Sequence, residues 1–308
     1  MKLKMRAYQG EADYWRIRTF LRQVYLLNQR REFNWQVSRF DYWRWHGIEN
    51  IHPMKLQEVI FLWETSNGQI AAVLNPEGPG DVFLQVHPNY DTPELAGAML
   101  ATAEQCLAIT KDQGQRRLRV WANAQNAPLN TLLADSGYQR GEWPEYQRWR
   151  SLSEPIRGAL PAPGYTIRSL GDVEELPARS LLSWKAFHPD EPDEHYQGWH
   201  WYPNVQRAPL YRRDLDLVAV APDGELASFC TVWFDDVTRC ATFEPVGTAP
   251  AHQRRGLASA VMGEGMRRAK RLGADLAAVG SYSQSAGALY ASLGFSQYDL
   301  SYPWTKEI

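Results

Sequence analysis

The sequence predicts two consecutive copies of a mixed α/β domain, each built on a mostly antiparallel sheet flanked by helices. The first observation behind this prediction is an internal repeat, in which Arg6 corresponds to Arg168 and Pro88 to Pro250, both at an offset of 162 residues. A period of this length indicates a duplicated domain and excludes a solenoid of short repeats. The second observation is that strand and helix patterns follow the same order in both halves.

A segment rich in proline and glycine separates the two halves. Residues 153–164 contain Pro155, Gly158, Pro161, Pro163 and Gly164. Such a cluster breaks helices and strands and is typical of a linker. We therefore expect domains at residues 1–152 and 165–308, joined by residues 153–164.

The second half shows the elements most clearly. Strand patterns cover residues 165–170, 215–221, 226–235, 239–248 and 275–280. Helical patterns cover residues 173–187, a stretch from near Gly256 to Leu272, and 285–293, while residues 193–202 are helical or irregular. Ligands of open α/β sheets bind where neighbouring strands separate at their carboxyl ends. We therefore expect the ligand crevice beyond strands 239–248 and 275–280.

Composition and charge exclude several classes of function. The chain has 308 residues, of which 44% are hydrophobic and 22% charged, as in an ordinary globular protein. A net charge of −2 gives no reason to expect nucleic-acid binding. No run approaches the roughly 20 apolar residues of a membrane helix, and the N-terminus lacks the apolar core of a signal peptide. We expect a cytoplasmic protein.

The cysteines support the same expectation. Cys106, Cys230 and Cys240 form neither a disulfide framework nor a metal-ligand spacing. They are interpreted as buried thiols in a reducing compartment.

The most informative motif is Gln253-Arg254-Arg255-Gly256-Leu257-Ala258, which lies between a strand pattern and a helix pattern. The first amides of a helix have no partner within the helix, and the helix dipole adds roughly half a positive charge there. Gly256 has no Cβ to keep the backbone away from phosphate oxygens. The motif therefore indicates a pyrophosphate site, although an ordinary helix start would show a similar pattern.

Two blocks of residues resemble a known family. Glu244-Pro245-Val246-Gly247-Thr248, followed by Pro250 and the Gln253–Ala258 motif, is similar to motif A of the GNAT superfamily of acyl-CoA N-acyltransferases. Ser283, Ala286, Leu289, Tyr290 and Leu293-Gly294-Phe295 are similar to its motif B, usually written Asn-x-x-Ala-x-x-Leu-Tyr-x-x-x-Gly-Phe. The two blocks in this order are far more specific than either alone. With the repeat, the chain resembles a tandem protein with two GNAT-like domains.

The resemblance implies acetyl-CoA as co-substrate, with no metal. The residues that would bind it are Val246, Gly247, Thr248, Gln253, Arg254, Arg255, Gly256, Leu257, Ala258, Ser283 and Ala286. Backbone amides of residues 254–258 would hold the pyrophosphate, and the strand edge at Val246 and Thr248 would pair with the pantetheine arm. The amide of Val246 would donate to the thioester carbonyl. Ser283 departs from the usual Asn, which puts a pantetheine contact of this side chain in doubt.

Two side chains are candidates for proton transfer. Tyr290 would protonate the leaving thiolate as a general acid, and its alternative is a buried aromatic whose hydroxyl caps a backbone group. Glu244 would accept a proton from the amine, directly or through water. Strict strand alternation would put Glu244 on the same face as Val246 and Thr248. The alternative is a strand-end carboxylate that faces solvent or pairs with Arg239 or another cation.

The acceptor site is expected at the first helices of the second half. Residues 188–195 contain four carboxylates, Asp190, Glu191, Asp193 and Glu194, which could attract a cationic amine. The favoured interpretation is a solvated loop, and its two histidines match no metal motif. Trp184, Trp199, Trp201 and Tyr202 could line an aromatic pocket but are assigned to the core.

The first half departs from motif A. Asp91-Thr92-Pro93-Glu94-Leu95-Ala96 replaces the Gly256 motif, so that Glu94 stands where Gly256 should be and Pro93 removes a donor amide. Its counterpart of motif B, residues 126–133, lacks a tyrosine. We expect this half to keep the fold without binding CoA and to cover the active half, shape the acceptor cleft or mediate homodimerisation.

The predicted function is N-acetyl transfer from acetyl-CoA to the primary amine of a small molecule, by direct attack in a ternary complex. Three alternatives stay open: a non-catalytic acyl-CoA sensor, an acetyltransferase for lysines of proteins or peptides, and an enzyme similar to mycothiol synthase. No nucleic-acid or membrane partner is expected.

Overall fold

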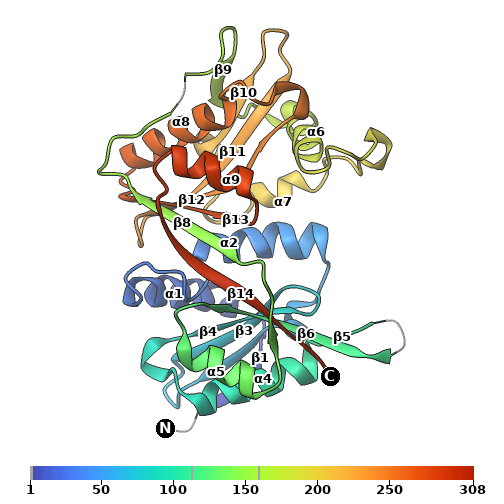
Figure 1. Cartoon of the computed structure of the whole chain (residues 1–308), viewed down its shortest axis with the longest axis vertical. Helices are drawn as coiled ribbons and strands as arrows, with labels where there is room; N and C mark the ends of the chain where they lie inside the picture. Colours follow the sequence, from blue (N-terminus) through green and yellow to red (C-terminus); the bar gives the residue numbers. More distant parts are fainter. Residues whose placement is uncertain (1–2, 112–113, 159) are drawn as a thin grey trace. The chain divides into compact units, whose positions relative to one another are not determined.

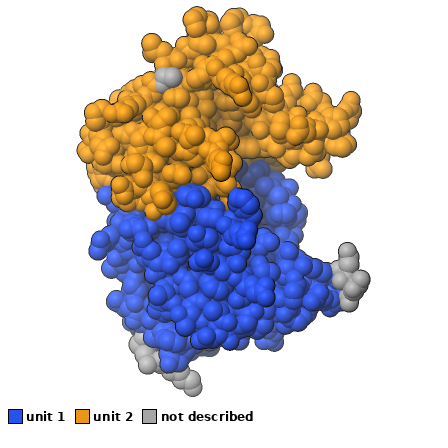
Figure 2. Space-filling model, viewed as in Figure 1, with its two compact units in different colours: residues 1–147, 299–308 blue, residues 148–298 orange. Residues whose placement is uncertain are grey.

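The computed structural model describes residues 3–111, 114–158 and 160–308, and the chain divides into two compact units (Figure 2). Unit 1 comprises residues 1–147 and 299–308, and unit 2 comprises residues 148–298. This division differs from the expected domains at the C-terminus. The last strand, β14 (Gln297–Glu307), pairs antiparallel with β6 from Ser301 opposite Asn123 to Glu307 opposite Arg117. A repeat in the sequence does not reveal such a pairing, because it depends on the path of the chain.

Unit 1 is a mixed sheet with helices on both faces (Figure 1). Its strands are β1 (Lys4–Ala7), β2 (Phe61–Glu64), β3 (Ile70–Gly78), β4 (Asp81–Val86), β5 (Ile109–Thr110), β6 (Arg116–Asn123) and β7 (Gln139–Arg140), followed by β8 (Glu145–Ser151). Its helices are α1 (Glu11–Leu27), α2 (Val37–Tyr42), the π-helical η1 (Trp43–Ile51), α3 (Leu56–Val59), the 3-10 turn η2 (Pro88–Tyr90), α4 (Pro93–Cys106) and α5 (Ala127–Asp135). The pairing of β4 with β6 is parallel, whereas β1 to β4 pair antiparallel.

Unit 2 has the same arrangement. Its strands run in the order β13 (Leu276–Ser281), β12 (Cys240–Thr248), β11 (Leu226–Asp235), β10 (Asp216–Val220) and β9 (Thr166–Ser169). Its helices are η4 (Val173–Glu175), α6 (Leu176–Phe187), η5 (Asp193–His195), α7 (Tyr202–Gln206), η6 (Arg213–Leu215), η7 (Pro250–His252), α8 (Leu257–Arg271) and α9 (Gln284–Ser292). The predicted fold class is confirmed: the sheet is mixed and mostly antiparallel, with helices on its faces.

The core of unit 2 explains why α8 forms where its apolar pattern predicts. Val261, Met262, Met266 and Ala269 of α8 are fully buried against the sheet. Gly265 lets the helix lie close, because a Cβ there would stand 2.9 Å from Val232. Helix α6 packs against the other face of the same strands, in a separate cluster that includes Phe229 (Figure 1). The two helices therefore hold β11 and β12 from both sides.

One acidic side chain of unit 1 has an unusual environment. Glu32 is half-buried, lines a small cavity of about 30 Å³ and lies near Arg39, Glu145 and Asp299. Burial is the main cause that raises the pKa of Glu32 to about 8, and the neighbouring carboxylates Glu145 and Asp299 raise it further. Arg39 and Gln36 counteract part of this rise.

The cysteine prediction is correct for two of the three residues. Cys230 and Cys240 are buried free thiols, as expected. Cys106 is exposed, so its predicted burial is wrong. It is the last residue of α4, on the exposed side, and the chain turns into the core at Leu107. No helix in the described ranges is long and apolar enough to cross a membrane.

Candidate active site

Strands β12 and β13 stop pairing at the place where the crevice is predicted. The two strands pair in parallel from Cys240 opposite Leu276 to Thr242 opposite Ala278. Beyond this point β12 continues to Thr248 and β13 to Ser281, and no further pairing joins them among the described residues. The edge of β12 that would face β13 is therefore open from Phe243 to Thr248. An open strand edge offers unpaired backbone groups to an extended ligand.

A β-bulge lies at the same place on the opposite edge of β12. Cys230 of β11 faces Val246, but Val232, two residues later, faces Phe243, so β12 carries one extra residue. Strict alternation from Phe243 to Val246 therefore does not hold, so counting along the strand does not fix the face of Glu244. Phe243 and Val246, three residues apart, both pack against the α8 core. The indole N–H of Trp233 donates to the carbonyl of Glu244, which holds the bulge in place.

Backbone direction in β12 fits the expected ligand contacts. Directly after the end of β12, the amide of Ala249 donates to the carbonyl of Ala227, near the start of β11, at 3.0 Å. In an antiparallel pair, every second residue of a strand points its backbone N–H and C=O at the neighbouring strand. Gly247, two residues before Ala249, therefore also turns its amide to β11. Val246 and Thr248 then turn their backbone groups to the open edge. The carbonyl of Thr248 accepts a long hydrogen bond of 3.4 Å from the side chain of Gln253.

The start of α8 presents a row of free amides. Arg254 (φ 59°) and Gly256 (φ 72°) both have the left-handed conformation, and the helix begins at Leu257. Within the described part of the chain, the amides of residues 254–258 donate no hydrogen bond. Successive amides in such a turn form a concave site for an anion, and the dipole of the helix strengthens it. The side chain of Leu257 is buried and anchors this start to the core.

The two arginines of the motif stay at the surface. The side chains of Arg254 and Arg255 are exposed. The Arg255 guanidinium group lies 5.9 Å from the centre of the Tyr165 ring and makes a weak contact of 3.5 Å with the carbonyl of Ala251. Both remain available to a charged ligand.

Tyr290 lies beside the open edge with its ring buried. The residue is 6% exposed, and its ring meets that of Phe295 edge to face at 6.2 Å. The hydroxyl makes no hydrogen bond within the described residues, so the predicted alternative of a backbone cap is not observed. Burial raises the pKa of Tyr290, and the nearby Cys230 and Glu244 raise it further. The phenol is therefore neutral near pH 7 and keeps a proton to donate.

Ser283 has a structural role that the motif comparison does not reveal. It is the N-cap of α9, and its hydroxyl accepts a hydrogen bond from the amide of Ala286 at 3.2 Å. Ala286 packs against the core. A serine directly before an apolar helix is itself an N-cap signal, so sequence reasoning could have found this role.

The region predicted for the acceptor has two parts. The carboxylates Asp190, Glu191, Asp193 and Glu194 are all exposed, which agrees with a solvated loop, and Nδ1 of His195 lies 3.5 Å from a carboxylate oxygen of Glu191. Tyr202 is buried and donates to Asp216, which confirms its core assignment. Trp184 is only half-buried and stacks on His188 at 3.9 Å. Its indole N–H is enclosed without a partner among the described residues.

The corresponding helix start in unit 1 is closed by its own residues. The hydroxyl of Thr92 accepts from the amide of Leu95 at 3.3 Å, and the Thr92 carbonyl accepts from the amide of Ala96 at 3.0 Å. Glu94 accepts a hydrogen bond from its own amide, which lowers the pKa of its carboxyl, and the Thr92 side chain adds to this effect. Pro93 has no amide proton. The first turn of α4 therefore leaves few donors for a phosphate.

Residues 177–295 match the family model of the acetyltransferase (GNAT) family. This segment of unit 2 is a GNAT-family domain. The matched segment lies in unit 2 and contains the open strand edge, the start of α8 and Tyr290. The chain is accordingly an acyltransferase, of a family that generally uses acetyl-CoA.

Solved structures with the same fold cover the whole chain. A GCN5-related N-acetyltransferase from Sphaerobacter thermophilus is 17% identical with a TM-score of 0.67, over 99% of this chain and 95% of the other. A tandem GNAT protein from the clavulanic acid biosynthesis pathway is 16% identical with a TM-score of 0.67, over 99% and 98%. A GNAT-family acetyltransferase from Colwellia psychrerythraea is 12% identical with a TM-score of 0.63, over 98% and 100%. A comparison with curated proteins returned no match.

Proposed function

We propose that the protein transfers an acetyl group from acetyl-CoA to the primary amine of a small molecule, and that unit 2 carries the reaction. One observation supports this proposal above the others. The amides of residues 254–258 have no partner in the described chain, and the open edge of β12 runs toward them. Acetyl-CoA has a diphosphate and an extended pantetheine amide chain, which are the groups that these two features would bind.

The diphosphate binds at the start of α8. The free amides supply hydrogen bonds to the phosphate oxygens, and the exposed Arg254 and Arg255 add charge-assisted contacts. Gly256 keeps the backbone accessible in a left-handed turn. The pantetheine arm then follows the edge of β12 at Val246 and Thr248. The remaining residues that surround the bound CoA are Gly247, Gln253, Leu257, Ala258, Ser283 and Ala286.

The reaction needs two proton transfers. The amine nitrogen attacks the thioester carbonyl carbon, and the carbonyl oxygen becomes an oxyanion that accepts from the amide of Val246. The C–S bond then breaks, and the sulfur takes a proton from the hydroxyl of Tyr290. That hydroxyl is protonated at neutral pH and has no partner among the described residues, which suits a donor.

Glu244 accepts the proton that the amine loses, directly or through one water molecule. The negative charge of Glu244 is one of the causes that raise the pKa of Tyr290, so the two groups lie close enough to act in one site. The bulge holds Glu244 half-buried at the open end of β12, through the bond from Trp233 to its carbonyl. A carboxylate at this position can accept the proton of an amine that is bound beside the thioester.

Unit 1 does not bind CoA in this proposal, so the chain takes up one CoA. The self-capped start of α4 and the carboxylate of Glu94 both oppose a phosphate at the corresponding place. Titration of the full chain with acetyl-CoA in a calorimeter is expected to give one site. Two equivalent sites would contradict the proposal for unit 1.

The function is tested by free-thiol release from saturating acetyl-CoA, with a panel of amines, aminoglycosides, amino acids and polyamines. We expect release that depends on the added amine, and its loss in Tyr290→Phe or Glu244→Gln. Acetyl-CoA binding without turnover for any amine would indicate a sensor instead. Acetylation confined to lysines of added peptides would indicate a protein or peptide acetyltransferase.

A further inference from the structure

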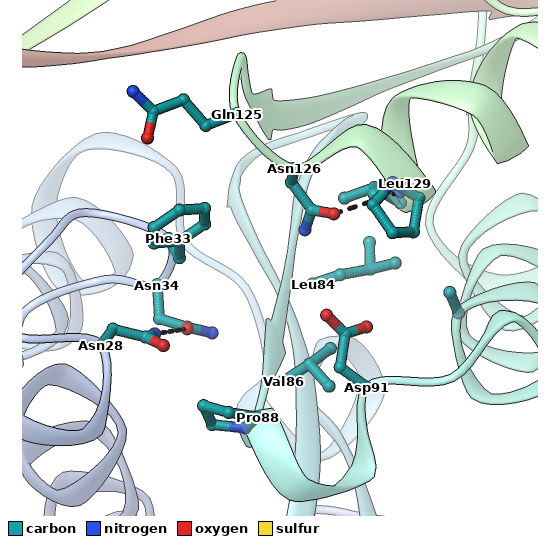
Figure 3. A pocket seen from close by; sticks show the side chains of 12 residues that line it. Asn28, Phe33, Asn34, Leu84, Val86, Pro88, Asp91, Gln125, Asn126 and Leu129 are labelled. Atoms are coloured by element: carbon teal, nitrogen blue, oxygen red, sulfur yellow. Dashed lines mark hydrogen bonds between the residues drawn. The ribbon is translucent and has the colours of Figure 1, made fainter.

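Unit 1 contains a cavity at the place where its own central strands separate. Strands β4 and β6 pair in parallel only from Asp81 opposite Arg119 to Phe83 opposite Trp121. A cavity of about 260 Å³ opens beyond this point, between the end of β4, the segment before α4 and the start of α5 (Figure 3). Leu84 and Val86 form part of its apolar wall. The cavity is built from unit 1 alone.

Two amide groups supply hydrogen-bond donors to this cavity. Asn34 is 7% exposed, and its side-chain oxygen accepts from the side chain of Asn28 at 3.0 Å. The oxygen of Asn126 accepts from the amide of Leu129 at 3.2 Å, as the cap of α5. Because each oxygen is used in this way, the NH₂ group of each side chain is the part that points into the cavity (Figure 3). Neither NH₂ group has a partner among the described residues.

A carboxylate faces these donors. Asp91 lies at the rim of the cavity, and both of its oxygens point inward (Figure 3). Its carboxylate has no hydrogen bond or ion pair within the described chain, whereas its backbone amide donates to the carbonyl of Pro88 at 3.4 Å. Asp91 is the one charged side chain among the described residues that line the cavity. Asp91 is an exposed residue, and the neighbouring protein atoms desolvate its carboxyl enough to raise its pKa, with no cation beside it to counteract this. A negative charge at the rim, with no cation beside it, attracts a cation from solution.

We propose that this cavity binds a small primary ammonium compound that also carries a carbonyl or hydroxyl oxygen and a short apolar group. The ammonium pairs with Asp91, the oxygen accepts from the NH₂ groups of Asn34 and Asn126, and the apolar group contacts Leu84 and Val86. The binding is non-covalent. CoA is excluded by its size and by the negative charge of Asp91. This site is separate from the proposed catalytic site of unit 2, and its existence does not depend on the proposed reaction.

Leucinamide is a suitable probe, because it combines an ammonium, a carbonyl and a branched apolar chain. Its matched control is 4-methylpentanamide, which lacks only the amino group. Binding of each compound to the full-length chain is measured by isothermal titration calorimetry at neutral pH. We expect leucinamide to bind and the control compound to bind at least roughly tenfold more weakly, as a charge-assisted hydrogen bond is lost.

Three variants locate the binding. Asp91→Asn keeps the shape and should weaken leucinamide binding roughly tenfold or more. Asn126→Ser keeps the cap oxygen of α5 but removes the NH₂ group, and should weaken binding by about two- to tenfold. Glu94→Gln is the matched control, because Glu94 is a nearby carboxylate that does not line the cavity, and it should bind like the unmodified protein. Thermal denaturation checks that each variant is folded.

Two results would overturn the proposal. One is no detectable binding of leucinamide to the folded protein. The other is equal binding by Asp91→Asn, which would place the amine elsewhere, such as the acceptor site of unit 2. Neither result bears on the proposed acetyl transfer, which thiol release measures independently.

Discussion

The left-handed turn at Gly256 allows a sharp test of the proposed pyrophosphate site. Gly256 has φ 72° directly before the first residue of α8. A side chain in this conformation costs roughly 1–2 kcal/mol, so Gly256→Ala favours a rearranged turn by that amount. If the turn holds the diphosphate only in its present form, acetyl-CoA binding should weaken by about 5- to 30-fold, because about 1.4 kcal/mol corresponds to a factor of ten.

The opposite end of the same helix supplies a matched control. Gly273 follows α8 with φ 105°, and a Cβ there would find only the Arg239 side chain, at 3.8 Å. Gly273→Ala therefore introduces a backbone strain at least as large as that of Gly256→Ala. This strain lies at the far end of α8 from the free amides. We expect it to lose stability and to keep its affinity for acetyl-CoA.

Calorimetric titration with acetyl-CoA and thermal denaturation together distinguish the two effects. Each variant should lower the midpoint of unfolding by a few degrees, at about 2–4 °C per kcal/mol for a chain of this size. Only Gly256→Ala should lose affinity. The reasoning fails if Gly256→Ala binds acetyl-CoA as the unmodified protein does, or if Gly273→Ala loses as much affinity.

Three further predictions follow from side chains. Tyr290→Phe should lower kcat by roughly 10²- to 10⁴-fold in the thiol-release assay, with little change in acetyl-CoA affinity; unchanged kcat would exclude the acid role. Glu244→Gln should lower kcat at every pH, and full activity would remove Glu244 as the base. Glu32, with a folded pKa of about 8, binds a proton in the folded state that the unfolded chain releases near pH 4.5. Its contribution to stability is therefore complete below about pH 4.5 and lost as pH rises to about 8. Because Glu32 is only half-buried, we expect Glu32→Gln to raise the free energy of unfolding at pH 9 by about 2 kcal/mol relative to pH 5; urea unfolding at both pH values tests this, and an unchanged pH dependence would contradict it.

The strand and helix patterns of unit 2 were predictable because they depend on neighbours in sequence. The apolar spacing of α8 and the glycine at its start are local properties, and the structure has the helix at Leu257–Arg271. The open edge of β12 follows from parallel strands that diverge, which the order of elements already implied. The site residues from Val246 to Ala258 accordingly lie along one continuous path.

Other features depend on contacts between distant segments. The bulge in β12 appears only in its register with β11 and in the bond of Trp233 to Glu244, so alternation counted along one strand does not hold through it. The return of β14 to unit 1 depends on its pairing with β6, far earlier in the chain. The cavity of unit 1 joins Asn34, Asp91 and Asn126 from three separate segments.

The sequence by itself determined the duplicated α/β plan, the family of the second half and the glycine turn before α8, because backbone conformation and hydrophobic periodicity are encoded over a few neighbouring residues. Only the tertiary structure decided where the bulge of β12 lies, where the last strand lies and which amides remain free. These outcomes depend on hydrogen bonds and burial that exist only after remote segments have packed together.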